Sequence, residues 1–243
     1  MSEPTLTTDG VPAGERRWGF GEVGIGIACS LVLSTLVGAM IMGVAGWTSG
    51  DDVPMWGLGL LQIPLWAGYL GAVWLAGTKG DGVVADFHLH TRPLDVPIGL
   101  AVGIVTQLVV LPLIYLPIFW LSDANSDDLS RPAEELAGRA DGTLSWVLFA
   151  LLVGICAPIV EELFYRGLLL RSAEKRGLSP WASAGVSALV FAAMHFQGLQ
   201  FPGLLAFGLV AGALVVVTGR LGPAIFAHIG FNLTTVVTLY LTT

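Results

Sequence analysis

Long apolar runs separated by short polar segments make up most of this chain. Runs of about 18 or more residues with few charges recur from residue 20 onward, which is the length of a membrane-crossing helix. We predict seven such spans, at about residues 20–46, 55–77, 96–121, 144–170, 180–196, 203–219 and 222–241. The pattern therefore predicts an all-α fold, a polytopic membrane helix bundle with about seven transmembrane spans.

The polar segments divide the chain into three parts. Residues 1–19 form a polar tail that lacks the basic start and short apolar core of a cleaved signal peptide, so we expect none. Residues 20–143 hold the first three spans and an amphipathic segment, KGDGVVADFHLHTRPLD, which we expect to lie at the cytoplasmic interface. Residues 144–243 hold the last four spans, in which several strongly polar side chains interrupt the apolar pattern.

Composition and charge agree with a membrane location. Only 12% of the residues are charged, against about 25% in soluble domains. The net charge of −7 argues against a nucleic-acid partner. An N-terminus in the cytoplasm follows the positive-inside rule and predicts a multi-pass protein of a plasma or bacterial inner membrane. In that orientation the cytoplasmic segments hold Arg16, Arg17, Lys79, Arg92, Arg171, Lys175, Arg176 and Arg220, and the outer loops hold Arg131 and Arg139.

Three charges stand in the middle of the fourth predicted span, GICAPIVEELFYRGLLL. Near the centre of a membrane helix a charge costs about 3 kcal/mol, whereas an apolar residue contributes only about 0.3–0.6 kcal/mol. These charges therefore need partners inside the bundle. Glu162 and Arg166 are four residues apart with the acid first, which is the favourable order for an ion pair within a helix. Glu161 points about 100° away around the helix and needs another partner.

Candidate partners for Glu161 lie on later spans. The fifth span contains FAAMHF, which places Phe191 one turn before His195, and the seventh contains HIGFN, which places His228 and Asn232 on one face. Buried polar groups without partners are costly, so convergence of these side chains in one wet pocket would satisfy them together. A carboxylate, two imidazoles and a carboxamide can activate water and stabilise an oxyanion.

The candidate residues differ in their expected depth. At about 1.5 Å per residue, Glu161 and His195 lie roughly 15–22 Å from the cytoplasmic ends of their spans, but His228 lies only about 9 Å from its own. Tilted helices would bring the three side chains level. A link QGLQFPG that dips into the protein interior would do the same.

The three motifs resemble those of a known family. EELFYR, FAAMH and HIGFN are similar to the EExxxR, FxxxH and HxxxN motifs of the CAAX protease and bacteriocin-processing (CPBP, also Abi) family. This family of intramembrane endopeptidases includes the type II CAAX prenyl endopeptidases. The resemblance covers residues 144–243, which would form the catalytic core, and residues 1–143 carry no matching motif. It implies an enzyme that hydrolyses a peptide bond of a membrane protein or peptide substrate.

The resemblance also implies roles for the motif residues. Glu161 and His195 would activate the attacking water, and His228 and Asn232 would hold the developing oxyanion. We expect this chemistry to need no cofactor. The alternative is a metalloprotease-like site with zinc held by Glu161, His195 and His228, a ligand set of known zinc enzymes, although an HExxH motif is absent.

Three further motif residues would support the site. Glu162 and Arg166 would brace it as an ion pair, and Phe191 would pack over it or serve as ordinary core.

Two other classes of protein stay open at this stage. A catalytically silent membrane scaffold or bacteriocin-immunity protein could have the same fold. A transporter also needs polar residues in mid-membrane, but transporters usually have repeated halves, and the first three spans bear little likeness to the last four. Whether the substrate is prenylated, whether the site opens to the cytoplasm or to lipid, and the oligomeric state are also left open.

Overall fold

The computed structural model describes residues 17–242, and these residues form helices and no strand. The polar tail predicted for residues 1–19 therefore lies mostly outside the described residues. The helices, with η1 a 3₁₀ turn and η2, η3 and η4 π-helical turns, are in chain order α1 (Phe20–Ala45), η1 (Gly50–Asp52), α2 (Met55–Thr78), α3 (Val83–Asp86), α4 (Asp95–Val105), η2 (Thr106–Val110), α5 (Leu111–Leu121), α6 (Ser126–Ala137), α7 (Gly142–Leu151), η3 (Leu152–Cys156), α8 (Ala157–Glu162), η4 (Leu163–Leu169), α9 (Leu170–Lys175), α10 (Pro180–Ala193), α11 (Phe201–Thr218) and α12 (Gly222–Thr242).

Six helical segments within the described residues are long and apolar enough to cross a membrane. Helices that run on through a π turn form a single segment, so α4 to α5 and α7 to α9 count once each. The finding confirms the prediction of an all-α, multi-pass membrane protein. The six segments are Phe20–Ala45, Met55–Thr78, Asp95–Leu121, Gly142–Lys175, Phe201–Thr218 and Gly222–Thr242.

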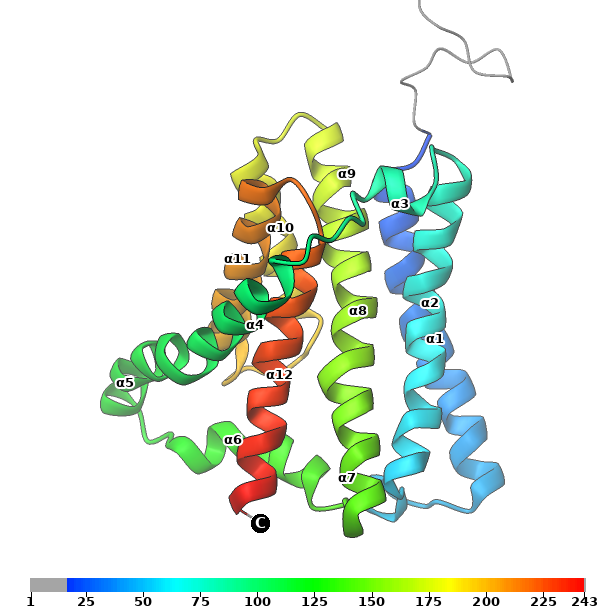
Figure 1. Ribbon diagram of the computed structural model, residues 1–243. Helices are drawn as coiled ribbons and strands as arrows, with labels where there is room; N and C mark the ends of the chain where they lie inside the picture. Colours follow the sequence, from blue (N-terminus) through cyan, green and yellow to red (C-terminus); the bar gives the residue numbers. More distant parts are fainter. Residues whose placement is uncertain (1–16, 243) are drawn as a thin grey trace, which may run out of the picture.

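The fifth predicted span is shorter than the sequence indicates. Instead of covering residues 180–196, α10 ends at Ala193 and has 14 residues, which is about 21 Å of helix at 1.5 Å per residue. The chain leaves it in a turn where Phe196 has a φ of 54°. The apolar pattern overestimates α10 because an apolar run looks the same whether the helix continues or turns. The link from α10 to α11 turns beside α12 within the height of the bundle (Figure 1), but none of its residues is buried, and Phe196 is 76% exposed.

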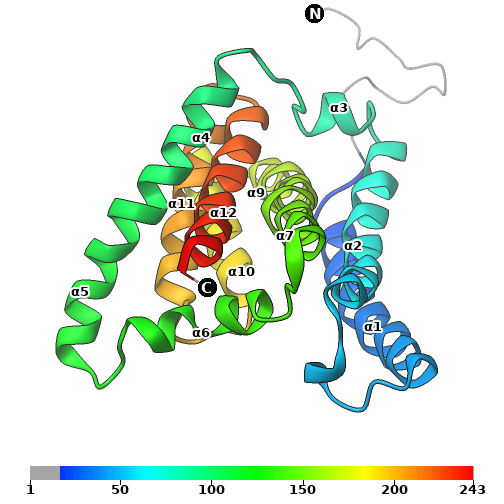
Figure 2. The ribbon, with the colours of Figure 1, turned by 60° about the horizontal axis from the view of Figure 1, so that its bottom comes forward.

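A long helix made of α7, η3, α8, η4 and α9 stands in the middle of the bundle (Figure 1). Figure 2 shows α1 and α2 on one side of it and α4, α11 and α12 on the other. The α5 helix extends away from the bundle, and α6 lies across the end at which α7 begins. The long helix is therefore the element that both halves of the molecule contact.

Small residues let neighbouring helices approach closely. A Cβ on Gly99 of α4 would lie 2.6 Å from the Cβ of Phe226 in α12. A Cβ on Gly103 would lie 2.6 Å from the Phe231 nitrogen and would overlap the carbonyl oxygen of Ala227. In lipid, such close packing stabilises helix pairs, because burying apolar surface there gains little over lipid contact.

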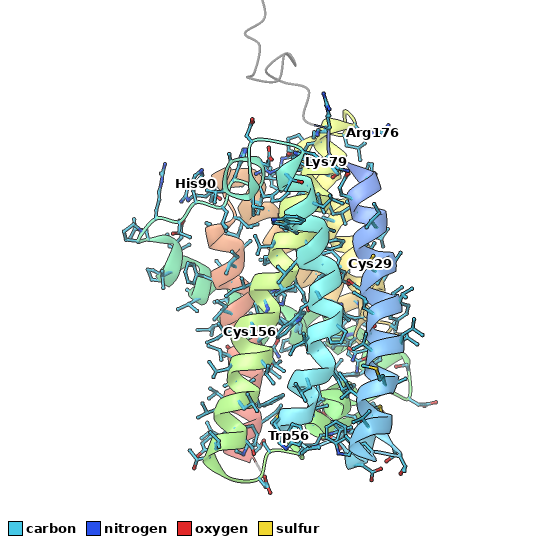
Figure 3. The ribbon with its side chains drawn as sticks, turned by 90° about the vertical axis from the view of Figure 1, so that its right-hand side faces the viewer. Cys29, Trp56, Lys79, His90, Cys156 and Arg176 are labelled. Carbon is cyan, nitrogen blue, oxygen red and sulfur yellow. The ribbon has the colours of Figure 1, made fainter. Side chains whose placement is uncertain are left out.

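Basic residues gather at one end of the bundle. Figure 3 shows Lys79, His90 and Arg176 at this end and Trp56 at the other. Lys79 forms an ion pair with Glu22, with 2.6 Å between Nζ and Oε1. The short helix α3, which belongs to the predicted interfacial segment, lies at the same end (Figure 1).

The loop between the third and fourth predicted spans contains a helix that the span prediction leaves out. Asn125 caps α6 by accepting hydrogen bonds from the backbone nitrogens of Asp127 and Asp128, and the Asp128 carboxylate accepts one from the Asn125 nitrogen. This capping box is readable in the sequence as Asn-x-x-Asp. Leu136 and Ala137 on its apolar face pack into a core with α2, α7 and α12, so α6 covers one end of the bundle.

Candidate active site

The two glutamates of the long helix lie between two π turns. Glu161 and Glu162 end α8, with η3 before it and η4 after it. A π turn re-aims the side chains around it, and such turns are frequent at functional sites. Glu162 and Arg166 form the expected i,i+4 ion pair: Oε1 of Glu162 lies 2.8 Å from Nη1 of Arg166, and both side chains are fully buried.

Three kinds of contact stabilise the buried Arg166 guanidinium. Besides the Glu162 carboxylate, Nη2 donates a hydrogen bond to the carbonyl oxygen of Gly208 in α11, at 3.2 Å. The guanidinium carbon also lies 4.5 Å from the ring centroid of Phe191, the geometry of a cation–π contact. Arg166 thus joins the long helix to α10 and α11.

His228 of α12 lies between the two glutamates. Its Nδ1 is 2.9 Å from Oε1 of Glu162, and its Nε2 is 3.8 Å from Oε2 of Glu161. The Glu161 side chain is 16% exposed, whereas those of Glu162 and Arg166 are fully buried and that of His228 is 4% exposed. Glu161 is therefore the most accessible of these four groups, which we call the charged cluster (Glu161, Glu162, Arg166 and His228).

The charged cluster is electrically balanced when it holds one mobile proton. The two glutamates carry two negative charges and Arg166 one positive charge, while the Nδ1–H of His228 donates to Glu162. Burial favours a cluster without net charge. One further proton is then needed, either on Nε2 of His228 or on the Glu161 carboxyl. These two atoms face each other across the 3.8 Å gap.

Phe191 lies beside the charged cluster, and His195 packs against Phe191. The Nδ1 of His195 is hydrogen bonded to the carbonyl oxygen of Phe191 at 2.7 Å, so it acts as the donor and leaves Nε2 as the basic nitrogen. The Phe191 ring is buried, with its centroid 4.6 Å from the ring of His195 and 5.7 Å from that of His228. Both imidazoles therefore pack against Phe191, which also belongs to the buried core of the bundle.

The spacing of Asn232 places it beside His228 on the face expected to hold the oxyanion, but its contact in the structure is with the backbone. It follows His228 by one turn of α12, but its Nδ2 donates to the carbonyl oxygen of Val153 in η3 at 2.8 Å. One of its two amide hydrogens is thus used to hold α12 against the long helix. The structure brings together Glu161, Glu162, Arg166, His228 and Phe191. It places His195 against Phe191 and bonds Asn232 to the long helix.

The donor set does not fit a zinc ion. Across residues 17–242, no three His, Cys, Asp or Glu side chains are grouped so that they could hold a metal. His228 directs Nδ1 at Glu162, and Arg166 already supplies a cation to the glutamates. The alternative of zinc held by Glu161, His195 and His228 therefore has no geometric support in the described residues.

An apolar cavity of about 280 Å³ lies next to the long helix. It is lined by residues of α2, α6 and the α7–α8 region, among them Trp66, Leu136, Val153 and Ala157. Ala157 precedes Glu161 by four residues, so both lie on the same face of the helix. Ala157 thus lies one helical turn from the charged cluster, whose own residues do not line the cavity.

Two parts of the site were beyond the sequence prediction. Phe207, which packs against the His228 ring with centroids 4.6 Å apart, and Gly208, whose carbonyl binds Arg166, both lie in the apolar run of α11. Nothing in their local pattern separates them from ordinary core. The glycine at 208 is the one readable signal, because glycine marks close helix contacts in membranes.

The fold and the charged cluster define a class: a polytopic membrane protein with a carboxylate–imidazole cluster inside its helix bundle, suited to acid–base chemistry. Residues 143–234 match the family of Rce1-like type II CAAX prenyl endopeptidases, and the chain carries a domain of this family. The resemblance that the motifs indicate is thereby confirmed, and the family implies a protease with a peptide substrate. No curated protein and no solved structure matches the chain.

Proposed function

We propose that this protein is an intramembrane endopeptidase in which Glu161 is the general base. The observation that carries the proposal is the 3.8 Å gap between Glu161 Oε2 and His228 Nε2. This distance is too long for a direct hydrogen bond. It would let one water molecule bridge the two atoms, with its oxygen about 2.8 Å from each of them. Such a water would lie on the accessible side of the charged cluster.

In the proposed reaction, Glu161 takes one proton from this water while the water oxygen attacks the scissile carbonyl carbon. The Nε2 of His195 accepts a hydrogen bond from the second water hydrogen and orients the nucleophile. The oxyanion receives hydrogen bonds from His228 and from the amide hydrogen of Asn232 that does not bind Val153. Glu161 then gives its proton to the leaving nitrogen as the peptide bond breaks, which yields a carboxylic acid and an amine.

Glu162 and Arg166 act on the reaction through His228. The Glu162 carboxylate holds the Nδ1–H of His228 and so keeps Nε2 directed at Glu161. Arg166 neutralises Glu162, so that the proton needed for balance stays between Glu161 and His228. The substrate class that fits is a membrane protein or membrane-bound peptide whose apolar portion reaches the cavity beside Ala157.

The test uses Glu161→Gln, with Glu135→Gln, an exposed glutamate of α6, as the matched control. Purified variants would be assayed on a peptide ending in a farnesylated Cys–aliphatic–aliphatic–X sequence and on its unfarnesylated copy. In parallel, the membrane proteomes of cells producing each variant would be compared. We expect Glu161→Gln to lower cleavage by about 100- to 10,000-fold and to let uncut membrane proteins accumulate.

The control Glu135→Gln should behave as wild type in both assays. Cleavage by Glu161→Gln at the wild-type rate would overturn the proposal. A cellular function that survives Glu161→Gln, without any accumulated substrate, would favour a scaffold or immunity protein instead. Treatment with a zinc chelator should leave cleavage unchanged, and loss of activity restored by added zinc would overturn the metal-free mechanism.

A further inference from the structure

His195 lies outside α10, in the turn that follows it. The helix ends at Ala193, and the backbone nitrogen of His195 bonds to the carbonyl oxygen of Ala192 at 3.3 Å. The next residue, Phe196, has the left-handed φ of 54°. The position of His195 therefore depends on residues 194–200, which we call the α10–α11 link, as well as on the helix before it.

Tyr115 of α5 holds the far end of the α10–α11 link. Its hydroxyl donates a hydrogen bond to the carbonyl oxygen of Leu199 at 2.9 Å and accepts one from the backbone nitrogen of Gly203 at 3.1 Å. The Gly203 amide belongs to the first turn of α11, where backbone donors have no partner within the helix. One buried hydroxyl thus satisfies a carbonyl of the link and an amide of the next helix.

The contact between Tyr115 and the link is close and specific. Tyr115 is 2% exposed, and a Cβ added to Gly203 would lie 2.9 Å from its hydroxyl oxygen. A second hydrogen bond, 3.0 Å from Nε2 of Gln200 to the carbonyl oxygen of Leu129, ties the link to α6. Neither α5 nor α6 carries a motif residue, so two elements outside the family motifs hold the link.

We propose that Tyr115 is a positioning residue that keeps His195 in its place against Phe191 by holding the α10–α11 link. The inference rests on the proposed function, in which His195 orients the attacking water. Without the hydroxyl, the Leu199 carbonyl and the Gly203 amide lose their buried partner. The link then shifts towards other partners, and His195, which precedes Leu199 in the same link, shifts with it.

The experiment compares Tyr115→Phe with Tyr240→Phe, which removes the hydroxyl of an exposed tyrosine of α12. One readout is steady-state cleavage of the peptide substrate of the preceding section. The other is the rate at which diethyl pyrocarbonate modifies His195 in the folded protein, measured by mass spectrometry. Exposed His90 is the internal control for the reagent. The second readout does not require enzyme activity.

We expect Tyr115→Phe to lower kcat by about 10- to 100-fold with KM little changed, since small misplacements of a catalytic group have effects of this size. The modification rate of His195 should change while that of His90 stays constant, and Tyr240→Phe should match wild type in both readouts. A second variant, Gly203→Ala, pushes on the same hydroxyl and should give the same pair of changes.

An unchanged His195 modification rate in both Tyr115→Phe and Gly203→Ala would overturn the proposal. So would an unchanged kcat in an active enzyme. If His195, His228 and His90 all react faster and the melting temperature falls, Tyr115 has only a general structural role, which also overturns it. If the wild type cleaves no peptide, the proposed function fails, while the His195 rate still decides whether Tyr115 holds His195 in place.

Discussion

Glu162 joins two other members of the charged cluster. One of its carboxylate oxygens, Oε1, contacts both Arg166 at 2.8 Å and His228 at 2.9 Å, and the side chain has no exposure to solvent. An ion pair in such surroundings gives little net stability, because the desolvation of its charges offsets their attraction. Removing one partner is costly all the same, since it leaves the others buried and uncompensated.

We expect Arg166→Ala to destabilise the protein by about 3–5 kcal/mol, the usual cost of breaking a buried ion pair. It leaves Glu162 without its cation and the Gly208 carbonyl without its donor. Cleavage should fall as well. Without Arg166, Glu162 competes with Glu161 and His228 for the proton that these two groups share. The measurement is unfolding in detergent, followed by a cleavage assay on the folded fraction.

The matched control for Arg166→Ala is Arg131→Ala. Arg131 pairs with Asp128 on the surface of α6, where its side chain is 62% exposed. Exposed ion pairs contribute about 0–1 kcal/mol, so this variant should unfold like wild type. Equal stability of the two variants would contradict the bracing role of Arg166.

At the scale of elements, the α4–α12 contact positions the helix that carries His228. Gly103→Ala would force a Cβ into the Ala227 carbonyl oxygen and towards the Phe231 nitrogen. We expect a loss of about 1–3 kcal/mol, the usual cost of overpacking, seen as a lower melting temperature. Gly43→Ala in α1, where an added Cβ meets nothing within 4 Å, is the control and should be neutral. Equal melting temperatures would show that α4 can move away from α12 at no cost.

The sequence predicts the long helices well because a membrane span needs a long apolar run, and such runs are visible without any tertiary information. It predicts the Glu162–Arg166 pair for a similar reason, since helix geometry alone brings residues four apart together. It does not predict the end of α10 at Ala193 or the π turns, because neither changes the apolar pattern. The capping signal of α6 at Asn125 is present in the sequence but lies in a segment that reads as a charged loop.

The contact partners of the polar residues in α12 could not be predicted from the sequence. Spacing correctly places His228 and Asn232 one turn apart, but only the packing of α12 against the long helix shows which partner each one takes. His228 contacts Glu162, 66 positions away in the chain, and Asn232 contacts the Val153 carbonyl, 79 positions away. A backbone acceptor such as the Val153 carbonyl has no signature in the sequence. It could therefore not be predicted that His228 contacts a carboxylate while Asn232 contacts the backbone.

At the scale of the whole molecule, the start of α1 and the end of α12 lie at opposite ends of the bundle (Figure 1). The α10–α11 pair enters and leaves at the end that holds the basic residues, so it does not alter this arrangement. With that end in the cytoplasm, the structure agrees with the positive-inside rule.

We therefore expect Arg176→Cys and Ser126→Cys, each in a Cys29→Ser, Cys156→Ser background, to react with an impermeant thiol reagent from opposite sides of the membrane. Arg176 follows α9 at the basic end, and Ser126 begins α6 at the other. The cysteine at position 176 should react only from the cytoplasm. Labelling of both positions from the same side would refute the topology, and exchange of the two sides would refute the orientation.

The electrical balance of the charged cluster has a consequence for how this sequence can change. Replacing Glu162 by an apolar residue strands Arg166 and His228, and replacing Arg166 strands Glu162. Any single substitution that removes one of these charges leaves another charge uncompensated in a medium that solvates it poorly. Loss of the ion pair without such a state therefore requires two substitutions at once.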